Sequence, residues 1–252
     1  MNALKYLAII KYVGTDFHGF QFQPDKRTVQ GELTRAAEAV FGAPTRVTGC
    51  SRTDAGVHAN GFAVTLESID GATPPPEKLP LAFARYLPDD LSLIHAEECA
   101  DGFHPRYDAI SKEYVYLIYN ASVADPFLRR GSWFLPRKIS DSGLLKMQTA
   151  AKQFIGKKDF YAFMSSGSDI EDTVREIYSL SVTRRENIIE LRISADGFLY
   201  NMVRIIVGTL VEVAFGRISA EDICDIIKKR DRSLAGMTAP AEGLYLDSVK
   251  YS

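Results

Sequence analysis

The chain has 252 residues, of which 46% are apolar and 25% are charged. This is enough for a substantial hydrophobic core in one large domain or two of ordinary size. Cys50, Cys99 and Cys224 are odd in number and lack a C-x-x-C spacing, which argues against disulfides and a structural zinc site and predicts a reducing, cytoplasmic location. The apolar stretch at residues 4–13 contains two lysines and is too short for a membrane span or a signal peptide, so we expect no membrane partner.

The formal net charge of −2 does not indicate a strongly basic protein. Residues 1–105 carry 9 Lys and Arg and 13 Asp and Glu, a net −4, whereas residues 106–252 carry 21 and 19, a net +2. Neither half has the excess of positive charge that is typical of a nucleic-acid-binding module. Binding to RNA would therefore need a local groove of positive charge rather than the field of the whole protein.

Hydrophobic periodicity divides residues 1–105 into strands and helices in the order β-α-β-β-α-β. Alternation of apolar and polar residues predicts strands at residues 4–13, 44–49, 61–67 and 91–99. Helices are predicted at residues 28–41 and, from a weaker pattern, at 77–87. The first helix has Thr28 as its N-cap, Gly42 as its stop signal and one apolar stripe, formed by Val29, Leu33, Ala36, Ala37 and Val40.

Residues 106–252 follow the same element order, without a repeat at the level of individual residues. The predicted elements are a strand at 112–119, a helix at 141–155, a hairpin at 176–184 and 188–195 that turns at Glu186 and Asn187, an apolar helix at 198–214, an extra helix at 220–230 and a strand at 243–251. We therefore predict an α+β fold of two ferredoxin-like halves, residues 1–105 and 106–252, whose mainly antiparallel sheets meet across a cleft.

The most informative segment is the polar stretch at residues 49–61, which reads Gly-Cys-Ser-Arg-Thr-Asp-Ala-Gly-Val-His-Ala-Asn-Gly and places Asp54 between an arginine and glycines. A glycine-rich loop with a surface ion pair would explain any lone Arg-x-Asp triplet. Seven consecutive residues, Arg52–His58, nevertheless resemble the active-site motif of the tRNA pseudouridine synthase A family, whose aspartate is the essential catalytic group. Ser51 stands where the family often has glycine.

The helix predicted at residues 198–214 is apolar almost all round except for Arg204. A buried guanidinium cannot lose its proton, so it needs an anionic partner. This partner could be a helix C-terminus, a structural glutamate or a carboxylate of an active site. The segment Phe-Leu-Tyr-Asn-Met-Val-Arg, which ends at Arg204, resembles the second motif of the family, and the resemblance implies that Arg204 pairs with Asp54.

Strand alternation places Tyr114 and Tyr116 on one face of the strand predicted at residues 112–119. Tyrosines in such a stripe commonly belong to the core, with the hydroxyl group reaching solvent. The strand follows Phe-His-Pro-Arg-Tyr at residues 103–107, and the combination resembles the third motif of the family. The resemblance implies that Tyr114 stacks on the target base, which suits an extruded uracil.

Further matches extend the resemblance over residues 4–251. Residues 14–23 match the family with Phe20 in place of a frequent tryptophan, and we expect this loop to serve RNA positioning or the fold. Residues 233–246 match the C-terminal motif, which implies that Leu246 lies in the wall of the active site. Residues 157–175 depart most from the family pattern.

Arg129 and Arg130 belong to a run of basic and aromatic residues that ends at Lys138. Such a run is either a solvated face or, if RNA binds, a set of phosphate contacts. The four histidines show no spacing that would hold a metal ion.

The resemblance implies an isomerase that converts uridine to pseudouridine in the anticodon stem-loop of tRNA, at positions 38–40 of the tRNA. Asp54 would act as a nucleophile or a base, and Tyr114 would hold the flipped base. Arg52, Thr53 and His58 would contact the substrate, with Arg52 filling the vacated stack or gripping a phosphate. No cofactor is implied, the partner is tRNA, and members of the family act as homodimers.

Two other functions stay open at this point. A non-catalytic RNA-binding or RNA-folding protein is possible because two sheets with aromatic faces can bind RNA without chemistry. The joint presence of Asp54, Arg204 and Tyr114 disfavours it. A ferredoxin-like regulatory domain for a small ligand rests on fold analogy alone and leaves these motifs unexplained.

Overall fold

The computed structural model describes residues 4–68, 70–167 and 170–252. Helices alternate with mainly antiparallel strands, which confirms the predicted α+β class. The chain forms two compact units: unit 1 extends to Ile110 and includes Tyr245–Ser252, and unit 2 is Ser111–Leu244. The last strand therefore belongs to unit 1, although chain order placed it in the second predicted half. The place of a strand in the chain does not specify its pairing partner.

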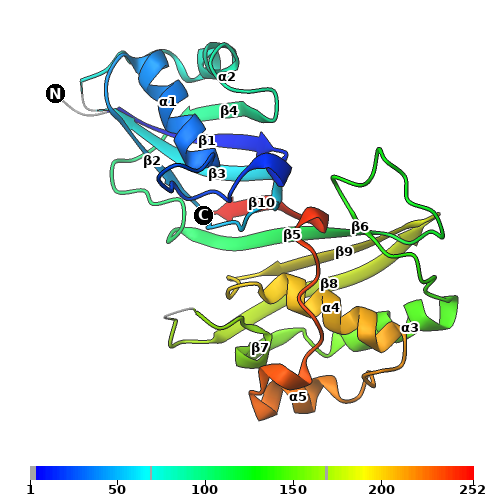
Figure 1. Cartoon of the computed structure of the whole chain (residues 1–252). Helices are drawn as coiled ribbons and strands as arrows, with labels where there is room; N and C mark the ends of the chain where they lie inside the picture. The colour runs from blue at the N-terminus through cyan, green and yellow to red at the C-terminus, as the bar shows by residue number, and fades with distance from the viewer. Residues whose placement is uncertain (1–3, 69, 168–169) are drawn as a thin grey trace. The chain divides into compact units, whose positions relative to one another are not determined.

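Unit 1 is built on a sheet against which α1 and α2 pack (Figure 1). Its elements are β1 (Leu4–Tyr12), α1 (Val29–Phe41), β2 (Thr45–Gly49), β3 (His58–Ser68), α2 (Leu79–Ala84), β4 (Leu91–Glu98) and β10 (Leu244–Tyr251). β1 lies between β3 and β4 and is antiparallel to both. β2 pairs antiparallel with the end of β3, and β10 pairs in parallel with its start. The element order predicted for the first half is confirmed.

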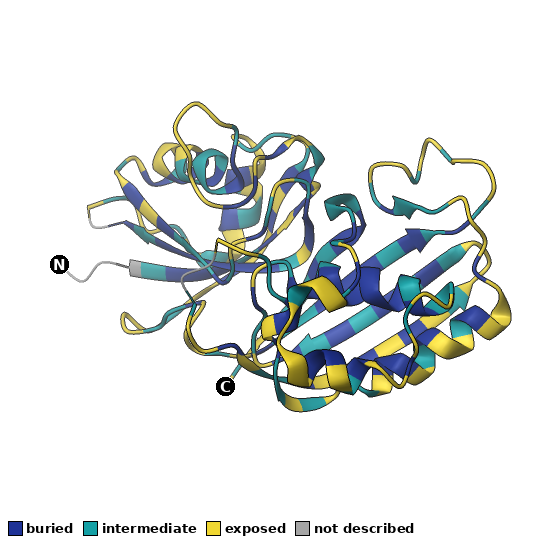
Figure 2. Cartoon of the chain, turned by 60° about the horizontal axis from the view of Figure 1, so that its bottom comes forward, coloured by how far each residue is buried: buried dark blue, intermediate teal, exposed yellow. Residues whose placement is uncertain are grey.

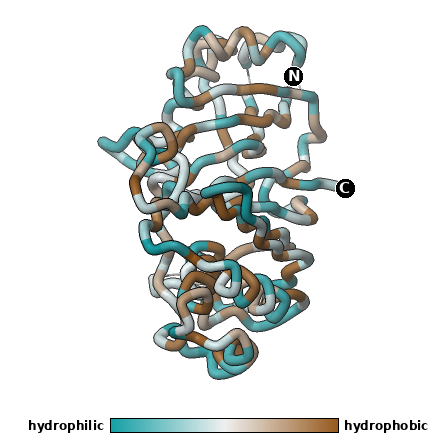
Figure 3. Tube along the Cα trace, turned by 90° about the vertical axis from the view of Figure 1, so that its right-hand side faces the viewer, coloured by the Kyte–Doolittle hydropathy of each residue, from teal (hydrophilic) through white to brown (hydrophobic). Residues whose placement is uncertain are grey.

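The core of unit 1 follows from the period of its strands and helices. Four alternate residues of β1 are at most 4% exposed: Tyr6, Ala8, Ile10 and Tyr12. α1 buries a stripe that Phe41, rather than the predicted Val40, completes, because the Phe41 ring stacks on Tyr6 with ring centres 5.7 Å apart. Figure 2 shows buried residues at intervals along the strands, and Figure 3 shows hydrophobic residues at intervals along the same part of the chain. Thr28 caps α1 as predicted, since its side chain accepts a hydrogen bond from the backbone of Gly31.

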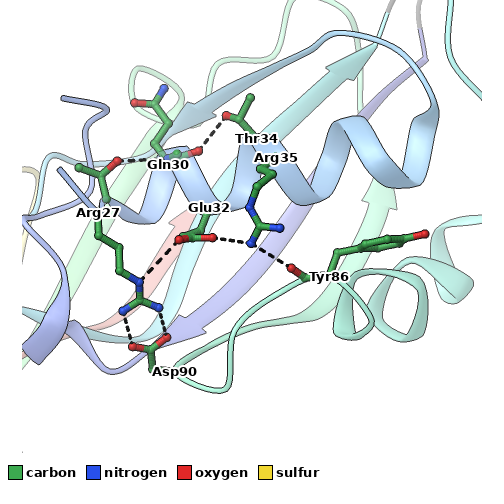
Figure 4. A network of polar contacts seen from close by, with 9 residues as sticks. Arg27, Gln30, Glu32, Thr34, Arg35, Tyr86 and Asp90 are labelled. Carbon is green, nitrogen blue, oxygen red and sulfur yellow. Dashed lines mark hydrogen bonds and ion pairs between the residues drawn. The ribbon is translucent and has the colours of Figure 1, made fainter. Parts of the chain in front are cut away.

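Arg27 ties the start of α1 to the loop before β4 (Figure 4). Its guanidinium donates two hydrogen bonds to the Asp90 carboxylate, at 2.8 and 2.7 Å, and lies 4.1 Å from the ring centre of Phe17. The hydrogen bond to Asp90 raises the pKa of Arg27. Glu32 of α1 contacts both Arg27, at 3.6 Å, and Arg35, at 2.6 Å. The bidentate pairing of Arg27 with Asp90 fixes the end of the long loop that follows β1.

The strands of unit 2 are mainly antiparallel to one another. Its elements are β5 (Ala109–Tyr119), β6 (Trp133–Phe134), α3 (Asp141–Lys152), β7 (Gly156–Asp159), β8 (Val174–Arg185), β9 (Ile188–Ala195), α4 (Met202–Ala214) and α5 (Ile223–Lys229). β9 lies between β5 and β8 and is antiparallel to both, β7 pairs with β8, and β6 pairs briefly with β5. α3 and α4 pack side by side. The hairpin of β8 and β9 turns at Glu186 and Asn187, as predicted.

α4 begins at Met202, later than the Phe198 expected from hydrophobicity, because Asn201 has a left-handed backbone (φ 59°) that cannot continue a helix. The helix is buried around most of its circumference, which confirms the interpretation of its apolar sequence. No helix among the described residues is long and apolar enough to cross a membrane.

The segment after α5 packs tightly on α4. A Cβ atom added to Gly208 would lie 1.8 Å from the carbonyl oxygen of Met237, and the backbone N–H of Gly236 donates to the Thr209 hydroxyl at 2.9 Å. Glycine at position 208 therefore allows the backbone of the following loop to contact the helix.

Replacing Gly208 with alanine should lower the free energy of unfolding by about 1–3 kcal/mol, because the added methyl group displaces the Met237 backbone. Gly102→Ala is the matched control, since a Cβ there meets nothing within 4 Å. Urea unfolding followed by circular dichroism measures both. Equal stability of the two variants would contradict the close packing.

Candidate active site

Asp54 lies in the tight loop that joins β2 to β3. Gly56 has a φ of +82°, and Val57 donates its backbone N–H to the carbonyl oxygen of Asp54 at 3.2 Å. The left-handed backbone explains the glycine in this motif. Asp54 is only partly buried, whereas Thr53 and Val57 on either side are buried. The turn therefore holds a partly buried aspartate between two buried residues.

Thr53 is held at both its side chain and its backbone. Its hydroxyl shares a 2.7 Å hydrogen bond with the hydroxyl of Tyr12 at the end of β1, and both side chains are at most 8% exposed. Its carbonyl oxygen accepts from the backbone of Phe20 at 3.1 Å. A Cβ at Gly19, whose φ is +84°, would lie 2.7 Å from that same oxygen. The loop at residues 14–23 thus supports the residue next to Asp54.

His58 begins β3 and is 1% exposed. Its Nδ1 accepts a hydrogen bond from the backbone N–H of Gly14 at 3.0 Å, which orients the ring. The ring stacks on Tyr245 with centres 4.6 Å apart. Burial raises the pKa of Tyr245. Leu246 is fully buried and pairs with Ala59, which places the C-terminal motif beside the start of β3.

Arg204 lies in the first turn of α4 and is fixed by hydrogen bonds within unit 2. Its Nε donates to the carbonyl oxygen of Ala239 at 2.7 Å, and its Nη1 donates to the Asn201 Oδ1 at 2.8 Å. The backbone N–H of Ala239 donates in return to the carbonyl oxygen of Arg204 at 3.1 Å. Arg232 holds the same loop through the Gly236 carbonyl oxygen, at 2.9 Å, and burial lowers its pKa.

The two tyrosines of β5 differ in what they contact. Tyr114 is 7% exposed, and its ring meets that of Phe198 edge to face with centres 5.1 Å apart. Tyr116 is fully buried and donates its hydroxyl to the carbonyl oxygen of Pro240 at 2.7 Å. Burial, together with the charge of Glu242, raises the pKa of Tyr116 well above its usual range. Tyr116 thus belongs to the core, whereas the role of Tyr114 stays a prediction.

Arg129 and Arg130 are exposed in the loop between β5 and β6. The loop is internally bonded, since Leu128 accepts from Gly131 and from the Ser132 hydroxyl, at 3.1 and 2.8 Å. Phe127, two residues before Arg129, is 95% exposed. The loop therefore exposes one aromatic ring and two cations on a hydrogen-bonded turn. The sequence patterns had not indicated that Phe127 is exposed.

The predicted site residues are divided between the units. Arg52, Thr53, Asp54, His58 and Leu246 belong to unit 1. Arg204, Tyr114, Arg129 and Arg130 belong to unit 2. The pairing of Asp54 with Arg204 therefore stays a prediction. Sequence reasoning missed Tyr12 and Gly19 as supports of the Asp54 loop, although the match at residues 14–23 was a signal for that segment.

Comparison with known proteins identifies the family of this chain. The profile of a family described as tRNA pseudouridine synthase matches residues 8–108 and 150–252. The tRNA pseudouridine synthase A of Acetivibrio thermocellus is 44% identical over 243 residues, covering 96% of this chain and 98% of that protein. The enzyme of the same name from Bacillus subtilis is 40% identical over 244 residues, covering 96% and 97%.

A third relative, the tRNA pseudouridine synthase A of Pseudothermotoga lettingae, is 41% identical over 251 residues, covering 98% of this chain and 99% of that protein. The chain belongs to the tRNA pseudouridine synthase A family. The enzyme class is therefore isomerase, and the resemblance read from Arg52–His58 is confirmed. A non-catalytic RNA-binding protein is not favoured.

Thr53→Val should lower the free energy of unfolding by about 1–3 kcal/mol, because it leaves the buried Tyr12 hydroxyl without the Thr53 oxygen. Tyr12→Phe should have a similar effect. The double variant should lose less than the sum of the two single losses, since the interaction can be broken only once. Urea unfolding of the four proteins measures this, and strictly additive losses would contradict a direct Tyr12–Thr53 interaction.

Proposed function

We propose that the chain isomerises uridine to pseudouridine in the anticodon stem-loop of tRNA, with Asp54 as the reacting side chain. The observation that carries this proposal is the anchoring of Thr53 by Tyr12 and Phe20, which fixes the chain next to the partly buried Asp54. The names of the relatives supply tRNA as the substrate class. The anticodon stem-loop and the role of Asp54 come from the resemblance of the motifs.

In this reaction the N1–C1′ bond of uridine breaks, the uracil turns, and a C5–C1′ bond forms. The proton lost from C5 is balanced by one gained at N1, so substrate and product contain the same atoms. Asp54 acts either as a nucleophile towards the base or the ribose, or as a base that removes a ribose proton. Either role requires the ionised carboxylate.

The other site residues support that carboxylate and hold the base. Arg204 keeps Asp54 ionised, because a nearby positive charge lowers the pKa of a carboxyl group. Arg52, an exposed residue of the same loop as Asp54, fills the vacated stack or contacts a phosphate. Tyr114 stacks on the extruded uracil and accepts or relays the C5 proton. Thr53, His58 and Leu246, which the resemblance assigns to substrate binding, form the wall of the site and are held by the contacts described above.

The proposal is tested with tRNA that carries tritium at uridine C5. The wild-type protein should release tritium, because forming the new carbon–carbon bond expels that atom. Asp54→Asn should abolish release while tRNA binding stays within about a few-fold, since the amide keeps the shape but neither attacks nor accepts a proton. Substantial release by a well-folded Asp54→Asn protein would refute the role of Asp54.

The protein is further proposed to act as a homodimer in which one subunit orients the tRNA for the other. This assignment comes from the family resemblance. It suits a chain whose net charge is −2, because Arg129 and Arg130 alone neutralise few phosphates, whereas two copies extend the positive surface.

Reversing the charge of Arg129 and Arg130 to glutamate should weaken tRNA binding and flatten its dependence on salt. Mixing this variant with Asp54→Asn subunits should restore part of the activity, because one site of the mixed dimer then combines an intact Asp54 with an intact partner loop. Tritium release by the mixture, compared with each variant alone, measures this. A monomer by light scattering, or no recovery after subunit exchange, rules out action between subunits.

A further inference from the structure

Asn201 occupies an unusual backbone position at the N-cap of α4. Its φ of 59° and ψ of 9° are left-handed, a conformation that costs a residue with a Cβ atom about 1–2 kcal/mol. Asparagine at an N-cap usually accepts a hydrogen bond from the first turn of the helix. The Asn201 side chain makes no such bond. A strained residue that does not use its side chain for capping indicates another task.

Both polar atoms of the Asn201 amide bond to side chains. Oδ1 accepts from Arg204 Nη1 at 2.8 Å, and Nδ2 donates to the Ser165 hydroxyl at 3.0 Å. Ser165 is itself tied to the turn before α4, since its backbone N–H donates to the carbonyl oxygen of Tyr200 at 3.1 Å. The two bonds fix the orientation of the amide, with its oxygen towards the guanidinium.

The guanidinium of Arg204 is thereby held at two of its nitrogen atoms. Nε donates to Ala239 and Nη1 to Asn201, so the plane of the group is set by acceptors on both sides. Each of these acceptors is a neutral amide or peptide oxygen. Neutral acceptors orient a cation without cancelling its charge, whereas a carboxylate at position 201 would form an ion pair with it.

We propose that Asn201 is a positioning residue, which aims the Arg204 guanidinium and, because it is neutral, reserves the positive charge of Arg204 for the Asp54 carboxylate. This inference rests on the proposed function of Arg204. It adds a requirement that hydrogen bonding alone does not impose, namely that position 201 must carry an oxygen acceptor without a negative charge.

Two substitutions separate this role from a structural one. Asn201→Gly keeps the left-handed backbone and removes the side chain. Asn201→Asp also tolerates that backbone and keeps an oxygen beside Arg204, but adds a charge. Asn201→Asp should have a higher free energy of unfolding in urea than Asn201→Gly and yet a lower activity. A merely structural role predicts that activity follows stability.

Turnover at saturating tRNA should fall about 10- to 100-fold in Asn201→Gly and further in Asn201→Asp, because small errors in the position of a reacting group are costly. The Kd for tRNA should change little, so that the loss lies in kcat. Glu186→Gly is the matched control, since Glu186 also has a left-handed backbone (φ 53°) but lies in the β8–β9 turn. It should retain the kcat of the wild-type protein.

Wild-type kcat in both Asn201 variants, or activity that follows stability, overturns the inference. If neither variant folds, Ser165→Ala decides, because it loosens the amide while leaving Asn201 in place. A smaller fall in kcat supports the role, and no change overturns it.

Arg204→Lys, measured in parallel, distinguishes this inference from the proposed function. Lysine lacks the planar fork of donors, so kcat should fall. Wild-type turnover in Arg204→Lys removes the proposed role of Arg204. Impaired Arg204→Lys with unimpaired Asn201 variants removes only the positioning role of Asn201.

Discussion

The anchoring of Thr53 is the constraint on which the proposed chemistry depends. Loops are commonly the mobile parts of a fold, whereas a reacting group must be held within about 0.5 Å of its productive place. In unit 1 the buried Tyr12–Thr53 hydrogen bond and the Phe20–Thr53 backbone bond remove that freedom at the residue before Asp54. The turn at Gly56 fixes the residues that follow. These bonds tie the loop to the end of β1 and to the segment that contains Phe20.

The supports of the Asp54 loop are themselves fixed by the sheet and by α1. Tyr12 ends β1, and the loop that carries Phe20 is closed by the bidentate pairing of Arg27 with Asp90. His58 links the start of β3 to Gly14 by a hydrogen bond and to Tyr245 by stacking. Contacts from β1, from the loop that carries Phe20 and from β10 therefore meet at the loop of Asp54 and at the start of β3.

Unit 2 holds Arg204 by a related arrangement, in which a helix terminus and a loop share the task. Arg232 fixes the loop, the glycine at position 208 lets the loop contact α4, and Ala239 then bonds to Arg204 through both its backbone groups. Two acceptors of the guanidinium are neutral oxygens, those of Ala239 and Asn201. These two groups orient the cation without adding a negative charge.

The sequence by itself determined the α+β class, most elements and the family, because period-two and helical patterns and the residues Arg52–His58 are local signals. It also indicated Thr28 as a cap and the turn at Glu186. Only the tertiary structure decided that β10 belongs to unit 1, that α4 starts after a left-handed Asn201, and that Tyr12 supports Thr53. These features depend on contacts between residues far apart in the chain or on a single backbone dihedral angle. Neither produces a periodic pattern in the sequence from which it could be predicted.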